Sequence, residues 1–203
     1  MAITSIKTGS SFTNLVKYND FLAGNPAFSP SSYESIASAT GTGSGSQIVF
    51  SSIPATYQHL QLRVIAKDTY TGGSIESTSG VIYFNSDTAS NYSIHAMQGN
   101  GTSVSASGTA TTTGIQPFMA TYGPSTNIYG VSIIDIHDYA STTKYKTVRS
   151  FMGADANTAS ASWTVRLTSG LWRSTSAITS ITLDVLISGF ATGSTFALYG
   201  IKG

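Results

Sequence analysis

The alternation of apolar and polar residues is clearest in residues 58–68, QHLQLRVIAKD. The apolar positions on one side of this run are Leu60, Leu62, Val64 and Ala66. The residues between them are polar or charged, and Ile65 is the one apolar exception. A period of two residues is typical of a β-strand that buries one face and exposes the other. The run therefore predicts a half-buried strand.

The same alternation of apolar and polar residues recurs in further segments along most of the chain, and turn-forming residues separate these segments. Further strand candidates are residues 33–40, 47–53, 81–85, 127–139, 144–152, 162–168, 180–187 and the C-terminal segment 193–203. Residues 99–114 are low in complexity and predict a long exposed loop or a ragged edge strand. About nine or ten strands in residues 33–203 predict an antiparallel β-sandwich of jelly-roll type. An immunoglobulin-like sandwich is the alternative, although the Cys–Trp–Cys pattern of that class is missing.

Two details of this pattern concern side chains in residues 162–172, in the last quarter of the chain. In residues 162–168, the alternation predicts that Trp163, Val165 and Leu167 point inward and that Arg166 points outward. Trp172 follows Gly170 and is expected at a rim of the sandwich.

Residues 1–32 do not alternate and are expected to form a separate N-terminal arm. Residues 11–23, SFTNLVKYNDFLA, predict one short amphipathic helix with an apolar stripe. That stripe consists of Phe12, Leu15, Val16 and Leu22. Such a short helix is marginal in water, so the stripe must be buried against its own domain or against another subunit. We expect the second case, an attachment arm.

Composition narrows the range of partners. Charged residues make up 9% of the chain and the net charge is +1, against roughly 25% charged residues in an ordinary soluble domain. A chain with so few charged residues and so small a net charge offers no basic surface for binding nucleic acid or an anionic membrane. There is no cysteine, no run of apolar residues long enough to span a bilayer, and no apolar segment of an export signal at the N-terminus. A low-charge surface is typical of proteins that are covered by neighbours or exposed to harsh surroundings, and on composition a secreted or extracellular β-sandwich is an equal alternative.

Few residues suggest chemistry. Asp135 and His137 share a strand face, but a metal ion would need at least one more ligand. The glycine-rich run at residues 41–46 lacks the lysine of a phosphate-binding loop, and no nucleophile elbow is present. We therefore expect no enzymatic activity, no cofactor and no catalytic metal. The 11 tyrosines leave two alternatives open, since exposed rings stack on sugars and buried rings fill a core or a subunit interface.

Residues 81–84 carry apolar side chains on both faces. They are Val81, Ile82, Tyr83 and Phe84. This pattern predicts either a central strand or a strand that packs against another chain. Together with the low charge, it suggests a subunit interface.

Three stretches of the sequence also carry a resemblance to a known group. They are LVKYNDFLAGNPAF with SSYESIASAT, then FSSIPATYQHLQLRV with FNSDTASNY, and finally ISGFATGSTFALYGIKG. Together they cover much of the chain and resemble small structural proteins of tailed bacteriophages, especially phages of cyanobacteria and marine bacteria. Such proteins are usually known only as virion or tail-fibre-like proteins.

The resemblance implies a location in the virion and, as partners, other virion proteins such as a major capsid protein or a tail protein. A homotrimer is expected, because phage jelly rolls are often trimers. The first functional expectation is a capsid cement or decoration subunit anchored by its N-terminal arm. The alternative is a tail-fibre or spike module that binds host surface polysaccharide. The resemblance brings no catalytic residues.

Overall fold

The computed structural model describes residues 32–72, 76–123, 127–155 and 164–202, and these fold into β-strands joined by turns and loops. The strands are β1 (Tyr33–Thr40), β2 (Gln47–Phe50), β3 (His59–Ala66), β4 (Glu76–Phe84), β5 (Tyr92–Gly99), β6 (Val104–Thr112), β7 (Ile115–Tyr122), β8 (Gly130–His137), β9 (Lys146–Gly153), β10 (Val165–Trp172), β11 (Ile181–Asp184) and β12 (Thr195–Ile201). The all-β prediction is confirmed for the described residues.

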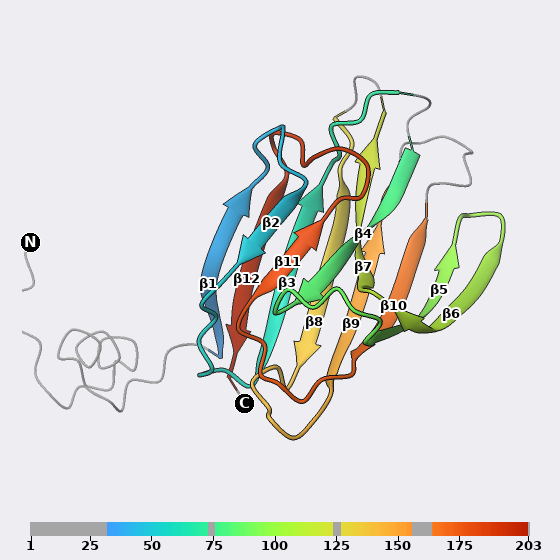
Figure 1. Cartoon of the computed structure of the whole chain (residues 1–203). Helices are drawn as coiled ribbons and strands as arrows, with labels where there is room; N and C mark the ends of the chain where they lie inside the picture. The colour runs from blue at the N-terminus through green and yellow to red at the C-terminus, as the bar shows by residue number, and fades with distance from the viewer. Residues whose placement is uncertain (1–31, 73–75, 124–126, 156–163, 203) are drawn as a thin grey trace, which may run out of the picture. The chain divides into compact units, whose positions relative to one another are not determined.

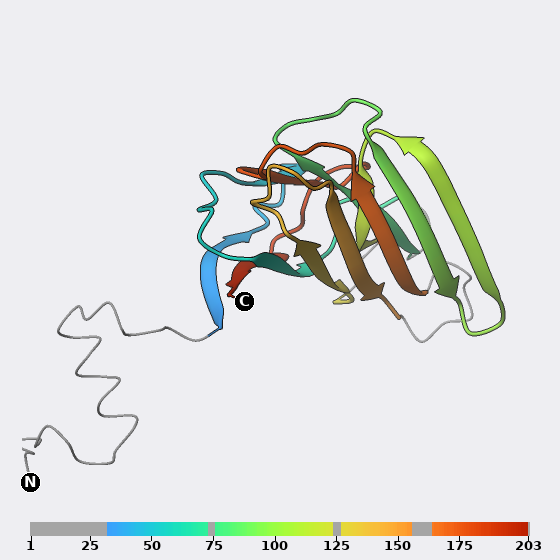
Figure 2. The ribbon, with the colours of Figure 1, turned by 90° about the horizontal axis from the view of Figure 1, so that it is seen from below.

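The strands form two antiparallel sheets that pack as a sandwich (Figure 1). The larger sheet has eight strands in the order β1-β12-β3-β8-β9-β10-β5-β6, and the smaller has four in the order β2-β11-β4-β7. Seen from below, the two sheets lie as layers, and the β5–β6 hairpin extends the larger one on one side (Figure 2). The larger sheet therefore continues beyond the area that the smaller sheet covers.

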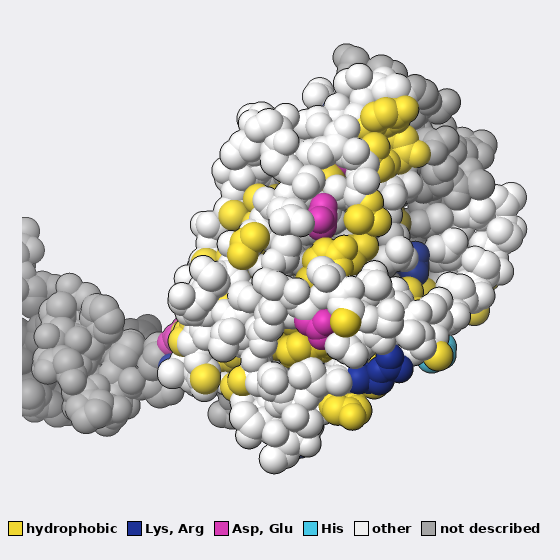
Figure 3. Space-filling view, viewed as in Figure 1, with side chains coloured by type: hydrophobic (Ala, Val, Ile, Leu, Met, Phe, Trp, Pro, Cys, Tyr) yellow, Lys and Arg dark blue, Asp and Glu magenta, His cyan; other side chains and the backbone are white. Residues whose placement is uncertain are grey.

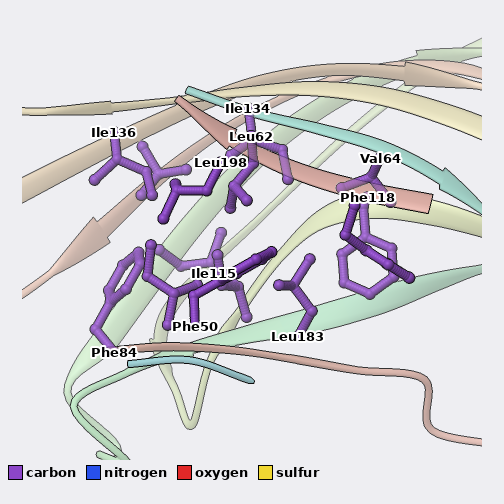
Figure 4. Packing of buried hydrophobic residues seen from close by; sticks show 14 of the residues in the cluster. Phe50, Leu62, Val64, Phe84, Ile115, Phe118, Ile134, Ile136, Leu183 and Leu198 are labelled. Atoms are coloured by element: carbon purple, nitrogen blue, oxygen red, sulfur yellow. The ribbon is translucent and has the colours of Figure 1, made fainter. Parts of the chain in front are cut away.

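The core lies between the sheets and follows directly from the alternation in β3. Leu60, Leu62 and Val64 have at most 1% of their surface exposed. In Figure 4, Leu62, Val64, Ile134, Ile136 and Leu198 of the larger sheet face Phe50, Phe84, Ile115 and Leu183 of the smaller sheet. Burying side chains of this size contributes about 1.5–3 kcal/mol each, which makes this layer the main source of stability.

Strand β7 is buried on both faces, and this explains its sequence. Residues from Pro117 to Thr121 are all buried. β7 pairs with β4 along one edge, and its Met119 N–H donates a hydrogen bond of 3.1 Å to Ser132 Oγ of β8. An edge strand tolerates proline because one side of its backbone needs no ladder partner.

The sequence underestimated the number of strands. β5 was not predicted, because its segment is surrounded by turn-forming residues, and β7 was not predicted, because it does not alternate. Of the two interpretations of residues 99–114, the edge strand is correct for β6. β6 has almost no buried side chain.

Two predicted orientations were wrong. Val165 and Leu167 are 54% and 44% exposed on the outer side of β10, whereas Arg166 lies half-buried on the inner side. Trp172 is buried and not at a rim. Its Nε1 donates a 2.8 Å hydrogen bond to Asp87 Oδ2, and its ring stacks on Tyr92 with 6.3 Å between centroids. Trp163 lies outside the described residues.

The chain divides between residues 31 and 32 into two units, and the second, Ser32–Gly203, contains the whole sandwich. The predicted helix and its stripe, Phe12, Leu15, Val16 and Leu22, lie outside the described residues. Within the described part of the chain, we find no helix with the length and hydropathy needed to cross a membrane.

Candidate functional site

The outer side of the larger sheet carries two neighbouring rows of apolar residues. Residues paired across an antiparallel ladder point to the same face, so register alone places them side by side. One row runs Ile133, Phe151, Leu167 and Met97 across β8, β9, β10 and β5; we name it the ridge. The other runs Val131, Gly153, Val165 and Gly99 across the same strands; we name it the hollow. Ile65 of β3 pairs with Val131 and extends the hollow.

These side chains are open to solvent. Seven of them, which we name the outer apolar face, are 44–55% exposed: Ile65, Met97, Val131, Ile133, Phe151, Val165 and Leu167. Single exposed hydrophobic residues are common, but a contiguous group marks a binding surface. On the opposite side of the sandwich, hydrophobic side chains lie in several separate groups, with a few acidic and basic side chains between them (Figure 3). The larger sheet therefore holds the candidate site.

A groove of about 1290 Å³ lies over the hollow. Gly99 and Gly153 have no side chains to fill it, and Ile133 and Phe151 of the ridge contribute to its wall. The β5–β6 turn forms another part of the wall, and the side chain of Asn100 shapes that turn. Its Oδ1 accepts hydrogen bonds from the backbone N–H groups of Thr102 (3.1 Å) and Ser103 (2.8 Å).

An aromatic corner stands beside the groove on β1, β3 and β12. The rings of Tyr33 and Tyr199 are 5.2 Å apart, and the Arg63 guanidinium lies 5.7 Å and 5.5 Å from their centroids. Contacts of this kind hold a cation against ring faces. Burial raises the pKa of Tyr33, and the nearby Arg63 opposes that shift. Both rings are thus engaged with Arg63.

A polar row borders the ridge on the side away from the hollow. Gln61 Nε2 donates a 2.8 Å hydrogen bond to Asp135 Oδ1. Arg149 Nη2 lies 3.8 Å from the other carboxylate oxygen of Asp135. The Asp135 carboxylate therefore has neighbours of complementary charge and polarity on this face.

His137, the other half of the predicted pair, lies next to His59, with 5.1 Å between ring centroids. The Asp138 N–H donates to His59 Nδ1 at 3.0 Å, and Lys144 Nζ donates to Asp138 Oδ2 at 2.7 Å. The hydrogen bond from Lys144 is the main reason that the pKa of Asp138 lies below its usual value. Within the described ranges, no three His, Cys, Asp or Glu side chains lie close enough together to hold a metal ion.

The residues of the expected interface strand belong to the core. β4 lies between β11 and β7, and Val81, Ile82 and Phe84 are buried there. Only Tyr83 of the four keeps partly exposed surface. The apolar residues on both faces of this segment are therefore explained by its central place in the smaller sheet.

Sequence reasoning missed the outer apolar face, although it contained one signal for it. Ile65 and Ile133 interrupt the polar sides of two strands that turn out to be neighbours.

In comparisons with known proteins, no family model, no curated protein and no solved structure matches this chain.

Proposed function

We propose that this chain is a structural subunit of a bacteriophage virion, with a capsid cement or decoration role as the first assignment. The observation that carries the proposal is the outer apolar face, an open hydrophobic surface on a chain with few charged residues. A surface of this kind suits a protein that works in contact with neighbouring subunits. The resemblance to phage structural proteins supplies the setting, and a homotrimer is part of the proposal.

A jelly-roll type of sandwich is also proposed, and the strand order supports it. The strands β1-β12-β3-β8 and β2-β11-β4-β7 make two sets of four in which the chain passes repeatedly from one sheet to the other. A jelly roll has eight strands in two such sheets. In this interpretation β9, β10, β5 and β6 are additions at one edge of the larger sheet.

The first test locates the protein in purified phage particles. Mass spectrometry of intact particles is expected to detect this chain, and electron microscopy is expected to place it on the capsid. Hundreds of copies per particle support the cement role, and a dozen or so indicate a tail position. Absence from the particles contradicts the proposal.

A second test concerns the N-terminal arm as the attachment element. Deleting residues 1–32 is expected to leave a folded protein that melts cooperatively but no longer joins particles. If the shortened protein fails to fold, the stripe of Phe12, Leu15, Val16 and Leu22 belongs to the domain core. If it still joins particles, attachment depends on the sandwich.

The alternative function is a tail-fibre or spike module that binds host polysaccharide. The groove favours it to the extent that Tyr129, Tyr199 and Asn100 line part of its wall, since sugars bind to aromatic rings and amide groups. Binding to host surface glycans that is lost in Tyr199→Ala would support this alternative.

A further inference from the structure

We propose that the outer apolar face binds a second copy of this chain, with the ridge of one copy seated in the hollow of the other. This inference rests on the proposed function only in expecting an oligomeric subunit. It names the contact surface, which the sequence had placed instead on residues 81–84.

The area of the face suits a subunit contact. Its seven side chains are each about half exposed, which leaves on the order of 600 Å² of apolar surface open, at the upper limit for the largest patch of a typical monomer. A stable interface buries roughly 800 Å² on each partner. The apolar face and its border therefore provide nearly the whole area that one side of such a contact needs.

The shape of the face is complementary to itself. The ridge projects Phe151, Leu167 and Met97, whereas the hollow next to it has glycine at two of its four positions, Gly99 and Gly153. A second copy that faces the first can insert its ridge into that space. If both copies do so about a twofold axis, the result is a pair; if each ridge enters the hollow of the next copy, the result is a closed ring.

The charges on the face do not oppose such a contact. On β8, β9, β10 and β5 neither the ridge nor the hollow contains a charged residue, and on β3 Arg63 pairs with Ile133 at the end of the ridge row. Two charged side chains that line the groove, Arg63 and Asp155, have opposite signs. Beyond the ridge, Asp135 lies near Arg149. Two copies of this face therefore do not bring an excess of like charge together.

The same observations disfavour a sugar as the main occupant of the groove. The hollow is built from valine and glycine, whereas sugar rings stack on exposed aromatic faces. The rings of Tyr33 and Tyr199 already lie against Arg63. A second copy supplies what the hollow lacks, namely apolar side chains that fill it.

The first experiment compares two matched valines in the full-length chain. Val131 in the hollow is 53% exposed, and Val49 on β2 of the smaller sheet is 56% exposed. We expect wild type and Val49→Asp to self-associate. For Val131→Asp, the dissociation constant of self-association is expected to be at least about tenfold higher, because this change places a carboxylate in an apolar contact. Analytical ultracentrifugation up to about 100 µM measures this, and circular dichroism verifies that both variants fold.

Either of two results overturns the proposal. One is a wild-type protein that stays monomeric over this concentration range. The other is a Val131→Asp variant that assembles as wild type does. This result also overturns the proposal if the variant has lost binding to glycans. A mass of two or of three chains supports the proposal, and three chains support the homotrimer as well.

A second experiment tests the ridge-in-hollow geometry. Phe151→Ala trims the ridge and Val131→Phe fills the hollow, so each is expected to weaken association. The double variant moves the bulk from the ridge to the hollow. Its association constant is expected to be at least about threefold higher than the value obtained by adding the free-energy losses of the two single variants. Purely additive losses contradict this geometry.

Failure of this proposal can be told apart from failure of the proposed function. A chain that self-associates through this face but is absent from phage particles contradicts only the virion assignment. A chain found in particles whose association is unchanged in Val131→Asp contradicts only the contact surface.

Discussion

The two faces of the larger sheet follow the same alternation but have different neighbours. On β8, Ile134 and Ile136 point inward and are fully buried, whereas Val131 and Ile133 point outward and are about half exposed. On β9 the polar residues Lys146 and Ser150 point inward and are buried. The hydrophobicity of a side chain therefore does not decide which face of this sheet is covered.

What covers the inner face is the smaller sheet together with loop residues such as Tyr57 and Phe190, and the inner side chains of β3, β8 and β12 are buried beneath them. Polar inner positions are tolerated where local partners exist. Lys146 Nζ, for example, donates to the carbonyl oxygens of Lys144 (2.7 Å), Thr175 (3.3 Å) and Ser174 (3.4 Å). The outer face has equally apolar residues and no second layer from the described residues. The following predictions test this difference between the faces, beginning with the largest effect.

The largest difference is expected between apolar side chains on opposite faces. Leu62→Ala is expected to lower the free energy of unfolding by about 2–5 kcal/mol, because it leaves a cavity between the sheets. Ile133→Ala is the matched change on the outer face and is expected to cost less than about 1 kcal/mol in the monomeric state. Urea unfolding at low protein concentration measures both, and equal losses would contradict the assignment of the faces.

The buried lysine provides the next test. Lys146→Met is expected to destabilise the protein by about 1–3 kcal/mol, because three carbonyl oxygens lose a hydrogen-bond donor in a buried place. The nearby Lys144, whose side chain is 65% exposed, is the control, and Lys144→Met is expected to cost less than about 1 kcal/mol. Thermal unfolding compares the two variants. A Lys146→Met variant as stable as wild type would show that the inner face does not need this cation.

The buried Tyr92 allows the inner face to be tested through the dependence of stability on pH. Its hydroxyl accepts a hydrogen bond from the Phe84 N–H (3.1 Å) and donates to the Asp87 carbonyl (2.9 Å), so Tyr92→Phe is expected to cost about 1 kcal/mol at neutral pH. Burial is the main cause that raises the pKa of Tyr92 in the folded protein.

The sign of the alkaline effect follows from that shift. Above about pH 10 an unfolded tyrosine loses its proton while the buried one keeps it, so stability falls as pH rises. Tyr92→Phe is expected to reduce this slope between about pH 9.5 and 11, as measured by the urea midpoint. An unchanged slope would mean that Tyr92 is not the group responsible.

The smallest effect is expected at a buried hydroxyl. Thr168 is 2% exposed, and its Oγ1 has no hydrogen-bond partner among the described residues. Thr168→Val keeps the shape and removes that group, so a gain of up to about 1 kcal/mol is expected. Thr147→Val on the outer side of β9 is the control and is expected to stay within about 0.5 kcal/mol of wild type. A clear loss in Thr168→Val would show that the hydroxyl is hydrogen-bonded in the folded protein.

Alternation predicted the strands that bury one face only. The range 33–40 was predicted for β1 and is correct, and the inner residues of β3 were assigned correctly. Each of these strands places apolar residues against the core and polar ones elsewhere. Such strands carry their orientation in their own sequence.

Strands that depart from this pattern could not be predicted in the same way. β7 is buried on both faces and contains Pro117, so it has neither the alternation nor the composition of an ordinary strand. In β10 the alternation was recognised, but its apolar side was assigned inward. Trp172 is buried in the core, and Thr168 lies on the same side of the strand. Because side chains alternate along a strand, Val165 and Leu167 must then point outward.

The sequence by itself determined the all-β class, the polar and weakly charged surface, and the periodicity of most strands. Only the tertiary structure decided which strands are neighbours, and therefore that Val131, Ile133, Phe151 and Val165 form one face. The reason is physical: a period of two fixes the two sides of each strand, but ladder register between segments far apart in the chain fixes which sides join. A surface shared by β3, β8, β9, β10 and β5 exists only after those ladders form.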